Sequence, residues 1–373
     1  MLKKLVIENF RGLDHLAFCP EQPCTLLLGK NGAGKSSLIA ALAVLQAIGR
    51  GESRTGELFD KYDLPVNDAA AHIVLFLQYE APQNGGLLEY CLKLSLPPSF
   101  KEVKVCQEYL HINGAPVFNR NEDSIELHQA KFTFDWHQIA LLSISPRQAQ
   151  PVIEKFISWL AHMILLAPAP ALIKSEATEK GSRDKYPLLD GSNLADWYSA
   201  LQMEYSEAME TIRPFLKQRM PDYDGIIAER AGPDVREIKL RFKGMQEAIS
   251  LARLSDGEKC FVAAALVLAA CKHYGPLLCV WDEPDNFLAY PDVSHFLRAL
   301  RDIFNNGGGQ FLATTHNLEA MHQFTLDEIL VLQRESHASG LALRKLADLD
   351  DDAKRLYRSL PSALKSGLLD GEA

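Results

Sequence analysis

The chain has 373 residues, of which 47% are hydrophobic, and its formal net charge is -9. This length and apolar content allow a large core, built as one big domain or as two lobes. The acidic balance excludes a protein that coats nucleic acid through its overall charge, so a nucleic-acid contact would need a local basic patch. The seven cysteines form no C-x-x-C pair, and several lie in apolar stretches. Buried, reduced thiols are therefore expected.

No apolar run reaches the roughly 18 residues that a membrane-spanning helix needs. The N-terminal stretch MLKKLVIENF is basic, but its apolar run is too short for a signal peptide. The longest apolar run, Phe261 to Cys271, is rich in alanine and predicts a buried helix. From these features we expect a cytoplasmic protein that does not enter a membrane.

Alternation and turn signals predict a β-rich first third that is interrupted by one helix. A strand at 2–8 pairs with a hairpin partner at 13–20, and a short apolar strand follows at 24–29. A helix is predicted from Ser36 to Ile48. Two strands at 72–80 and 87–96 form a hairpin, and β-like pieces continue over 101–135.

The later part of the chain predicts more helix. A strongly apolar helix is expected at 150–166, and a loop rich in Pro, Lys and Glu at 167–193, which we take as a candidate partner surface. One long helix, or two that are broken near Pro214, should cover 194–220, and a strand should cover 235–244. The segments are predicted as an N-terminal nucleotide-binding lobe at 1–135, a helical insert lobe at 136–250, a C-terminal nucleotide-binding lobe at 251–345 and a tail at 346–373.

The stretch GKNGAGKSS matches the phosphate-binding pattern G-x-x-x-x-G-K-[ST] and lies between a predicted strand and a predicted helix. Its glycines let backbone N–H groups converge on phosphate oxygens, and the helix start adds a positive dipole end. Lys35 is expected to reach the β- and γ-phosphates, and the Ser36 hydroxyl to hold Mg²⁺. The predicted ATP-binding residues are Gly29, Lys30, Asn31, Gly32, Ala33, Gly34, Lys35, Ser36 and Ser37.

Two later strands end in polar residues that a nucleotide site needs. The apolar run LLCVWDEP delivers Asp282 to the Mg²⁺ shell and places Glu283 to polarise the attacking water. The strand QFLATTH ends in His316, which is predicted to sense the γ-phosphate. Taken alone, each strand could end in solvated or structural side chains, but the phosphate loop in the same chain favours the catalytic interpretation.

The stretch LSDGEK precedes a long apolar helix and predicts a second anion site at a helix N-terminus. Ser255, Gly257 and Glu258 are the candidate residues. Because one nucleotide does not need two such sites from one chain, we expect two chains to face head to tail, with ATP between the phosphate loop of one and Ser255 of the other. The alternative is an ordinary N-cap that Glu258 completes.

With all four motifs in order, the chain resembles ABC-type ATPases of the SMC/RecF-like group. It is most similar to the AAA-domain branch found in bacterial DNA-repair and anti-phage proteins, including Septu-like and OLD-like ATPases. The resemblance covers about residues 1–96 and 190–330 and includes KLVIENFRGL and DGSNLADWYSAL. It implies an α/β fold: an ABC-type P-loop NTPase head with a mixed sheet, an antiparallel β subdomain and a helical lobe. It also implies ATP and Mg²⁺ as cofactors, ATP hydrolysis, and an ATP-dependent homodimer.

The same resemblance places Arg11 near the nucleotide and leaves one metal-site residue open. His72 has the position expected for a glutamine at the edge of the lobe hairpin, whereas Gln78 is the nearest glutamine but lies inside a strand. The chain also departs from the branch in two places. After Asp-Glu-Pro the branch commonly has Glu and then Leu-His-Pro, whereas this chain has the segment Asp285 to Pro291. Before the long apolar helix it has Asp256 where the branch commonly has Gly.

We expect an ATP-driven switch that controls a partner effector such as a nuclease, plausibly in anti-phage defence, because the chain shows neither heptads for a long coiled coil nor a nuclease motif of its own. The first alternative is a RecF-like repair clamp that binds DNA directly. Its candidate basic residues are Lys101, Lys104, Lys174 to Lys185, and Arg236 to Lys243. The second alternative, an ABC transporter ATPase subunit, is disfavoured by the Asn-Phe-Arg opening.

Overall fold

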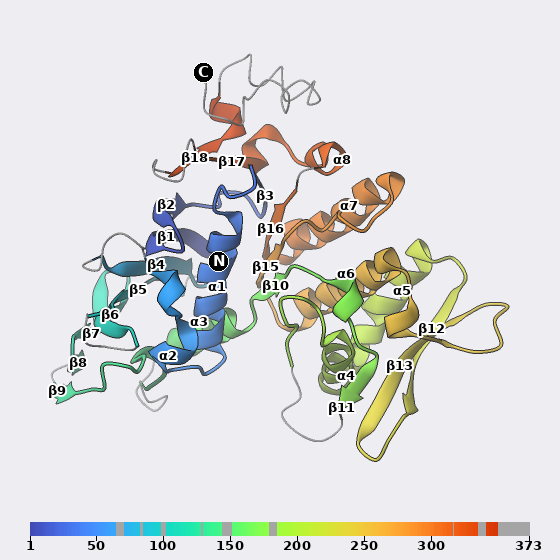
Figure 1. Cartoon of the computed structure of the whole chain (residues 1–373), viewed down its shortest axis with the longest axis horizontal. Helices are drawn as coiled ribbons and strands as arrows, with labels where there is room; N and C mark the ends of the chain where they lie inside the picture. The colour runs from blue at the N-terminus through green and yellow to red at the C-terminus, as the bar shows by residue number, and fades with distance from the viewer. Residues whose placement is uncertain are drawn as a thin grey trace. The chain divides into compact units, whose positions relative to one another are not determined.

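The computed structural model describes residues 1–64, 71–82, 85–97, 102–127, 130–143, 151–178, 185–315, 317–334 and 341–349. The chain divides into two compact units (Figure 1). The first unit comprises Met1–Met163 and Leu326–Ala373, and the second comprises Ile164–Thr325. The predicted boundary after residue 135 therefore falls inside the first unit, and the predicted boundary after residue 250 falls inside the second.

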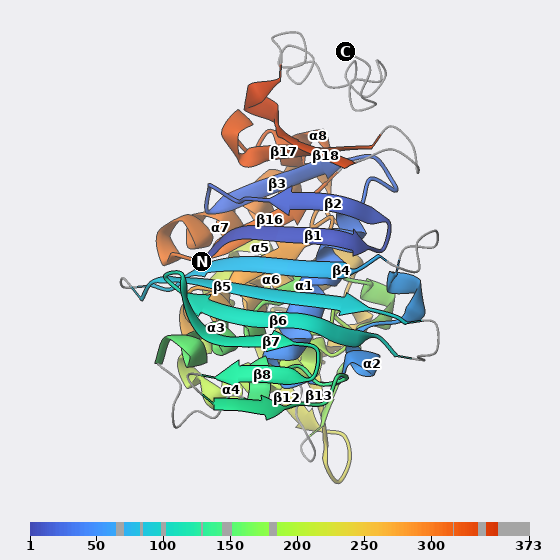
Figure 2. The ribbon, with the colours of Figure 1, turned by 90° about the vertical axis from the view of Figure 1, so that its left-hand side faces the viewer.

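The first unit is built around an antiparallel sheet of eight strands in the order β2-β1-β4-β5-β6-β7-β8-β9, which Figure 2 shows face on. The strands are β1 Leu2–Phe10, β2 Leu13–Phe18, β4 Ile73–Glu80, β5 Leu87–Ser95, β6 Lys104–Ile112, β7 Ala115–Asn121, β8 Ser124–Leu127 and β9 Ala130–Thr133. Its helical segments are α1 Lys35–Gly49, α2 Thr55–Leu58, η1 Lys61–Asp63, η2 Leu141–Ser143 and α3 Pro151–Ala161.

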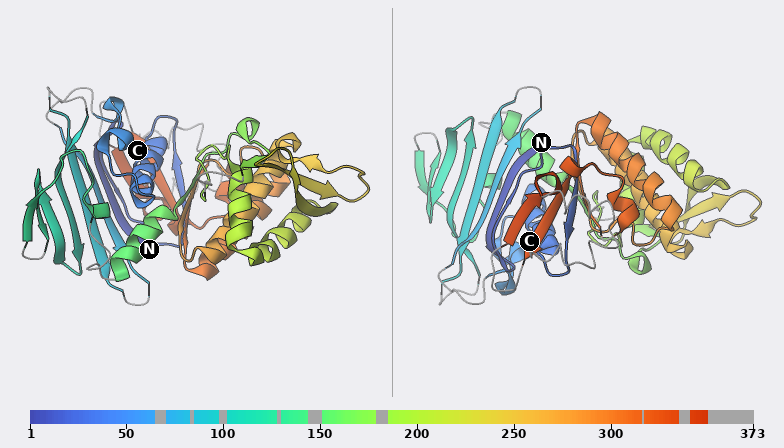
Figure 3. Two further views of the ribbon diagram at one scale, coloured as in Figure 1. Left: turned by 90° about the horizontal axis from the view of Figure 1, so that it is seen from below. Right: turned by 90° about the horizontal axis from the view of Figure 1, so that it is seen from above.

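One face of this sheet packs against α1 and α3, which lie on the same side of it in Figure 3. Alternate residues of β4 are buried, from Ile73 to Tyr79, as period-2 patterning of a half-buried strand requires. Tyr79 packs on Trp159 of α3 with ring centroids 4.7 Å apart, and Tyr90 of β5 lies 6.1 Å from Phe156. These aromatic contacts fix α3 against the sheet.

A buried ion pair fastens the segment after β9 to the same sheet. Glu108 of β6 and Arg120 of β7 are fully buried and lie 3.5 Å apart. Glu108 also accepts hydrogen bonds from the Tyr90 hydroxyl at 3.0 Å and from two backbone N–H groups at positions 140 and 141. The Arg120 guanidinium donates to the backbone carbonyl of Asp135 at 2.7 Å. Because both charges have several partners, the pair can remain inside the fold.

The strand β3 Cys24–Gly29 is fully buried and pairs in parallel with β17 Ile329–Arg334, which pairs antiparallel with β18 Leu341–Lys345. Short 3-10 turns, η6 Leu326–Glu328 and η7 Leu346–Asp348, flank these strands. The first unit thus contains both the β3 strand that leads to the glycine loop and two strands from much later in the chain.

The second unit contains a parallel set of three strands, in which β15 Leu278–Trp281 lies between β10 Ile164–Leu166 and β16 Gln310–Thr314. It also contains a small sheet in which β13 Val235–Phe242 pairs with β11 Glu176–Thr178, β12 Tyr223–Arg230 and β14 Ile249–Ser250. The remaining elements are η3 Pro170–Leu172, α4 Leu194–Glu204, η4 Ser206–Ala208, α5 Met209–Arg219, η5 Leu251–Arg253, α6 Asp256–His273, α7 Tyr290–Gly307 and α8 Leu318–Met321.

The predicted buried helix is confirmed in α6, where every residue from Lys259 to Ala270 is buried. Two other helix predictions are wrong in part. The expected helix at 150–166 ends at Ala161, and Ile164–Leu166 forms β10, because a short apolar run does not by itself distinguish a buried strand from a buried helix. The 194–220 helix breaks at Tyr205, whose ring stacks on His273 at 5.0 Å, and Pro214 lies inside α5.

The described residues of the predicted loop, 167–178 and 185–193, include regular structure. They contain η3 and β11, and they donate backbone hydrogen bonds within the segment, such as Ala167 N–H to the Leu189 carbonyl at 2.7 Å. All seven cysteines are free thiols, and four of them are buried, which confirms the expectation of reduced thiols. Among the helices that the structure describes, none has the length and apolar content to cross a bilayer.

Candidate functional site

The glycine loop joins the buried strand β3 to helix α1 in the first unit. Gly32 and Gly34 both have positive φ, +81° and +107°. At Gly34 a Cβ atom would also come within 2.7 Å of Leu13 Cδ2, so that position requires glycine for its conformation and for its space. The loop closes on itself through the Ala33 N–H, which donates to the Lys30 carbonyl at 3.1 Å.

Lys35 is the first residue of α1 and is buried, with 8% of its surface exposed. Its ammonium group donates hydrogen bonds to the backbone carbonyls of Gly29 and Lys30, the latter at 3.2 Å. The cation is therefore folded back over the loop that precedes it. Ser36 is exposed, and the Ser37 hydroxyl donates to the Arg11 carbonyl at 3.0 Å.

The start of α1 fits an anionic ligand. Within this described helix, Gly34 supplies no side-chain cap and the first turn has no acidic residue. The first N–H groups of a helix and its positive dipole end favour negative charge. Together with a buried lysine and an exposed serine hydroxyl, this is the donor set that a nucleotide's phosphates and their Mg²⁺ would use.

Arg11 lies in the tight turn between β1 and β2, where Arg11 and Gly12 both have positive φ. Its guanidinium pairs with Asp63, whose side chain is 3% exposed, and it lies 5.4 Å from the centre of the Phe10 ring. The Arg11 N–H donates to the Asp63 carbonyl at 3.0 Å. Arg11 thus lies beside the first turn of α1, where its carbonyl accepts the Ser37 hydroxyl, and its guanidinium forms an ion pair with Asp63 of η1.

The two alternatives for the metal-site residue lie at opposite ends of β4. His72 directly precedes β4 and is level with the end of β1 near Arg11, since Glu8 pairs with Val74. Gln78 pairs with Lys4, and its amide donates to Glu89 at 2.8 Å. Six residues of strand separate the two positions by about 20 Å. His72 thus lies at the Arg11 end of the sheet and Gln78 does not, and both metal-site alternatives stay predictions.

In the second unit, the carboxyl ends of β15 and β16 bring Asp282 and Glu283 to Thr314. The strands are parallel, with Trp281 opposite Ala313. The Thr314 hydroxyl donates to the Asp282 carboxylate and accepts from the Glu283 N–H at 2.9 Å. Glu283 has a φ of +48°, which is unusual for a residue with a side chain. Its carboxylate accepts a hydrogen bond from the Asn286 amide.

A second threonine repeats the pattern one residue further on. The Thr315 hydroxyl donates to Asp285 at 2.8 Å and accepts from the Asn317 N–H at 2.9 Å. Asp285 is only 6% exposed, and burial raises its pKa while the Thr315 hydrogen bond opposes the rise. The predicted γ-phosphate sensor, His316, lies outside the described residues.

Ser255 caps α6 with a complete capping box. Its hydroxyl accepts from the Glu258 N–H at 3.3 Å, and the Glu258 carboxylate accepts from the Ser255 N–H at 2.8 Å. A Cβ at Gly257 would lie 3.0 Å from the Phe287 carbonyl. The start of α6 therefore lies against the segment that follows Asp282 and Glu283. The structure shows the N-cap that we gave as the alternative interpretation, and the contact of Ser255 with ATP held by a second chain stays a prediction.

The predicted residues thus fall into two groups. The glycine loop, Arg11 and His72 gather in the first unit, and Ser255, Asp282 and Glu283 belong to the second. The sequence reasoning missed Thr314 and Thr315. The TT pair directly before His316 was the available signal, because threonine at a strand end can offer a hydroxyl to the neighbouring strand's end.

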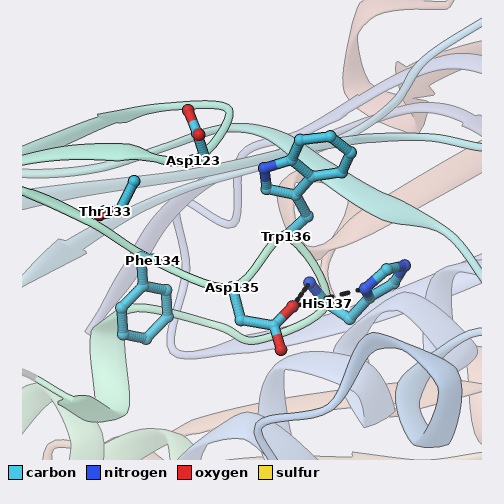
Figure 4. A pocket seen from close by; sticks show the side chains of 6 residues that line it. All are labelled: Asp123, Thr133, Phe134, Asp135, Trp136 and His137. Carbon is cyan, nitrogen blue, oxygen red and sulfur yellow. Dashed lines mark hydrogen bonds and ion pairs between the residues drawn. The ribbon is translucent and has the colours of Figure 1, made fainter.

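A separate cavity of about 560 Å³ lies in the first unit and is lined by Asp123, Thr133, Phe134, Asp135, Trp136 and His137 (Figure 4). The Asp135 carboxylate accepts from the His137 N–H at 2.8 Å, and this hydrogen bond lowers the pKa of Asp135. Lys104 lies 5.0 Å from the centre of the Trp136 ring. No predicted site residue lines this cavity.

Comparison with known proteins identifies the family of this chain. A family model described as "AAA domain, putative AbiEii toxin, Type IV TA system" matches residues 24–321. The DNA replication and repair protein RecF of Chlorobium luteolum is 49% identical over 41 residues, which is 11% of this chain and 11% of RecF.

Solved structures of SMC heads share the fold. The structure described as "SmcHead bound to the C-winged helix domain of ScpA" superposes with a TM-score of 0.55 and 16% identity, over 95% of this chain and 99% of the other. A second solved structure is an SMC head domain with an extended coiled coil, bound to the C-terminal domain of ScpA derived from Pyrococcus furiosus. It superposes with a TM-score of 0.51 and 15% sequence identity, over 96% of this chain and 99% of the other. These likenesses show the predicted SMC-head-like P-loop ATPase fold.

Proposed function

The chain belongs to this AAA-domain family, and we propose that it is an ATP-hydrolysing switch that dimerises around two ATP molecules and controls a partner. The observation that carries the proposal is the pairing of two features in one chain. One is a glycine loop at an uncapped helix start with a buried lysine, and the other is a carboxylate pair oriented by Thr314.

The chemistry proposed for the site follows from these groups. Backbone N–H groups of the loop and the Lys35 ammonium bind the phosphates, and this requires Lys35 to exchange the carbonyls of Gly29 and Lys30 for phosphate oxygens. Ser36 and Asp282 hold Mg²⁺, which when bound neutralises charge on the β- and γ-phosphates. Glu283 orients the attacking water and accepts its proton.

Head-to-tail dimerisation is proposed because Ser255 lies at the start of α6, where the sequence predicts a second phosphate contact, although the first turn of α6 carries Asp256 and Glu258. Ser255 and the N–H groups from Gly257 onward would contact the ATP that is held by the phosphate loop of a second copy. In the isolated chain the Glu258 carboxylate accepts a hydrogen bond from the Ser255 N–H and another from the Ser255 hydroxyl, the latter at 2.7 Å. A γ-phosphate would therefore displace this carboxylate when two copies close.

The proposed partner is an effector protein such as a nuclease, in an anti-phage role. The family description, which refers to a toxin of a toxin–antitoxin system, supports a defence context. A RecF-like clamp on DNA is the second candidate, because a short segment is 49% identical to RecF. Two of its candidate basic residues are already paired: Lys239 with Glu229 at 2.6 Å, and Lys104 with Glu122 at 3.3 Å. This weakens the case for direct DNA binding.

The test is Glu283→Gln, compared with Glu210→Gln, which changes an exposed carboxylate on α5. Glu283→Gln should bind ATP and hydrolyse it about 100-fold or more slowly, because the group that takes the water proton is gone. Glu210→Gln should match the wild type. With ATP and Mg²⁺, native mass spectrometry of Glu283→Gln should show a dimer. A monomer that holds ATP would contradict the dimeric switch, and near-normal turnover would contradict the role of Glu283.

A further inference from the structure

The hydroxyl of Thr314 makes one hydrogen bond to each of the two residues that are predicted to be the metal ligand and the catalytic base, Asp282 and Glu283. It donates its proton to the Asp282 carboxylate and accepts the N–H of Glu283 at 2.9 Å. A hydroxyl has one proton to donate, so donation to Asp282 leaves only its lone pairs for Glu283. Each bond thus fixes the direction of the other.

The Thr314 side chain is buried, and neighbouring strands hold the backbone on both sides of Asp282. Thr314 is 0% exposed, and it ends a strand that pairs along its length with β15. The Asp282 N–H donates to the Leu166 carbonyl of β10 at 2.7 Å, so the backbone of Asp282 is held from the opposite side. A buried N–H without a partner is costly, and in this arrangement Thr314 supplies the partner for Glu283.

The backbone of Glu283 is where such support is needed. Its φ of +48° lies in the left-handed region, which side chains other than those of Asn and Asp rarely adopt. Strained conformations of this kind persist only when the surroundings over-determine them. Three restraints on Glu283 are its N–H bond to Thr314, the Asn286 amide contact to its carboxylate, and the Asn286 N–H, which donates to its carbonyl at 3.2 Å.

We propose that Thr314 is a positioning residue that holds Glu283 in its left-handed conformation and aims the Asp282 carboxylate at the metal ion. This inference rests on the proposed ATPase function and adds a residue to it. Because Thr314 is 0% exposed, it would act through its neighbours and not by contact with the nucleotide. It acts by setting the orientation of the Glu283 and Asp282 side chains where they follow β15.

The experiment compares Thr314→Val, which has the same shape without the hydroxyl, with Thr314→Ser, which restores the hydroxyl. The matched control is Thr55→Val, because Thr55 is also 0% exposed and its hydroxyl donates to the Val103 carbonyl at 2.7 Å, in the other unit. Thr314→Val should lower kcat about 10-fold or more and also raise the KM for ATP with Mg²⁺, because the base and the metal ligand both lose their orientation. Thr314→Ser should recover most of the rate, and Thr55→Val should lose stability but keep kcat.

The double variant Thr314→Val with Glu283→Gln separates positioning from a general loss of stability. If Thr314 acts through Glu283, the second change should lower kcat little further once Glu283 is replaced. A Thr314→Val protein with wild-type kcat, or a loss equal to that of Thr55→Val, would overturn the inference.

A readout that does not depend on turnover decides the case in which the wild type hydrolyses no ATP and the proposed function itself fails. The affinity for ATP would then be measured by calorimetry with Mg²⁺ and with EDTA. The wild type should bind more tightly with Mg²⁺, and Thr314→Val should lose most of that gain while Thr314→Ser keeps it. An unchanged Mg²⁺ effect in Thr314→Val would overturn the positioning role.

Discussion

The side-chain amide of Asn9 donates a hydrogen bond to the backbone carbonyl of His72 at 3.0 Å. This contact ties the residue before β4 to the end of β1, two residues before Arg11. Asn9 itself has a φ of +54°. The predicted nucleotide-side residues Arg11 and His72 are thereby held at the same end of the sheet, although 61 positions separate them in the sequence.

This placement predicts different results for His72 and Gln78. His72→Ala should weaken the Mg²⁺-dependent part of ATP binding, because His72 lies at the Arg11 end of the sheet. Gln78→Ala should leave it unchanged, because its amide only bonds Glu89 across the strands. Calorimetric titration of ATP with and without Mg²⁺ measures both variants. Equal behaviour of the two would remove His72 from the proposed site.

Lys35→Ala should weaken ATP binding by about 10- to 100-fold, since a charge-assisted hydrogen bond to phosphate is lost. Lys131→Ala is the matched control, because Lys131 is exposed on β9 and belongs to no predicted site. The control should bind ATP as the wild type does. Because Lys35 also bonds two loop carbonyls, thermal unfolding of both variants should be recorded. Normal ATP affinity in a folded Lys35→Ala protein would contradict the phosphate-loop assignment.

Ser255→Arg should bind ATP but fail to dimerise, because a long cation would fill the space that the second copy's nucleotide needs. Loss of the N-cap should also lower the free energy of unfolding by about 1 kcal/mol. Ser255→Thr keeps a capping hydroxyl and should still dimerise. Sedimentation velocity with ATP, in the Glu283→Gln background, measures the outcome. ATP-driven dimers of Ser255→Arg would argue against the composite site.

Arg120→Met should lower the free energy of unfolding by about 3–5 kcal/mol, because it leaves the buried Glu108 without its cation. Lys239→Met removes the cation from a surface pair with Glu229 and should change the free energy of unfolding far less. Urea unfolding of both proteins measures the contrast. Similar losses of unfolding free energy in the two variants would mean that burial does not determine how much the Glu108–Arg120 pair contributes to stability.

The Arg120→Met deficit should also grow with pH. Burial raises the pKa of Glu108 above its usual value of 4.5, and the nearby Arg120 charge lowers it. Without Arg120 the pKa rises further, so the native state holds the proton more tightly than the unfolded chain does. Stability then falls as pH rises from about 4.5 through the raised pKa. A deficit that is larger at pH 5 than at pH 8 would contradict this linkage.

The sequence predicted those parts of the site that local pattern determines. The glycine loop is formed by a strand, a turn and a helix in immediate succession, and α6 is formed by one long alanine-rich run. Because both patterns are continuous in the sequence, both elements could be predicted from it. The Ser255 cap was also visible, because Glu258 stands three residues later. The roles assigned to these residues in binding ATP stay predictions.

Other features depend on contacts between distant segments and could not be read in this way. Thr314 looks like an ordinary strand residue until β15 is placed beside β16. The break at Tyr205 depends on stacking with His273, which tertiary packing alone supplies. The end of α3 at Ala161 depends on β15 being available to pair with Ile164–Leu166. In each case the partner lies tens of residues or more away in the chain.

The pairing of β3 with β17 has a consequence for how the protein is made. Leu26 pairs with Ile329, so the strand that leads into the glycine loop leaves the ribosome about 300 residues before its neighbour exists. At roughly 5–20 residues per second, this delay is about 15–60 s. During that interval the nascent chain holds an apolar strand whose edge toward β17 is unpaired, which is the kind of surface that chaperones bind. The first unit therefore completes its fold only after the whole second unit has been synthesised.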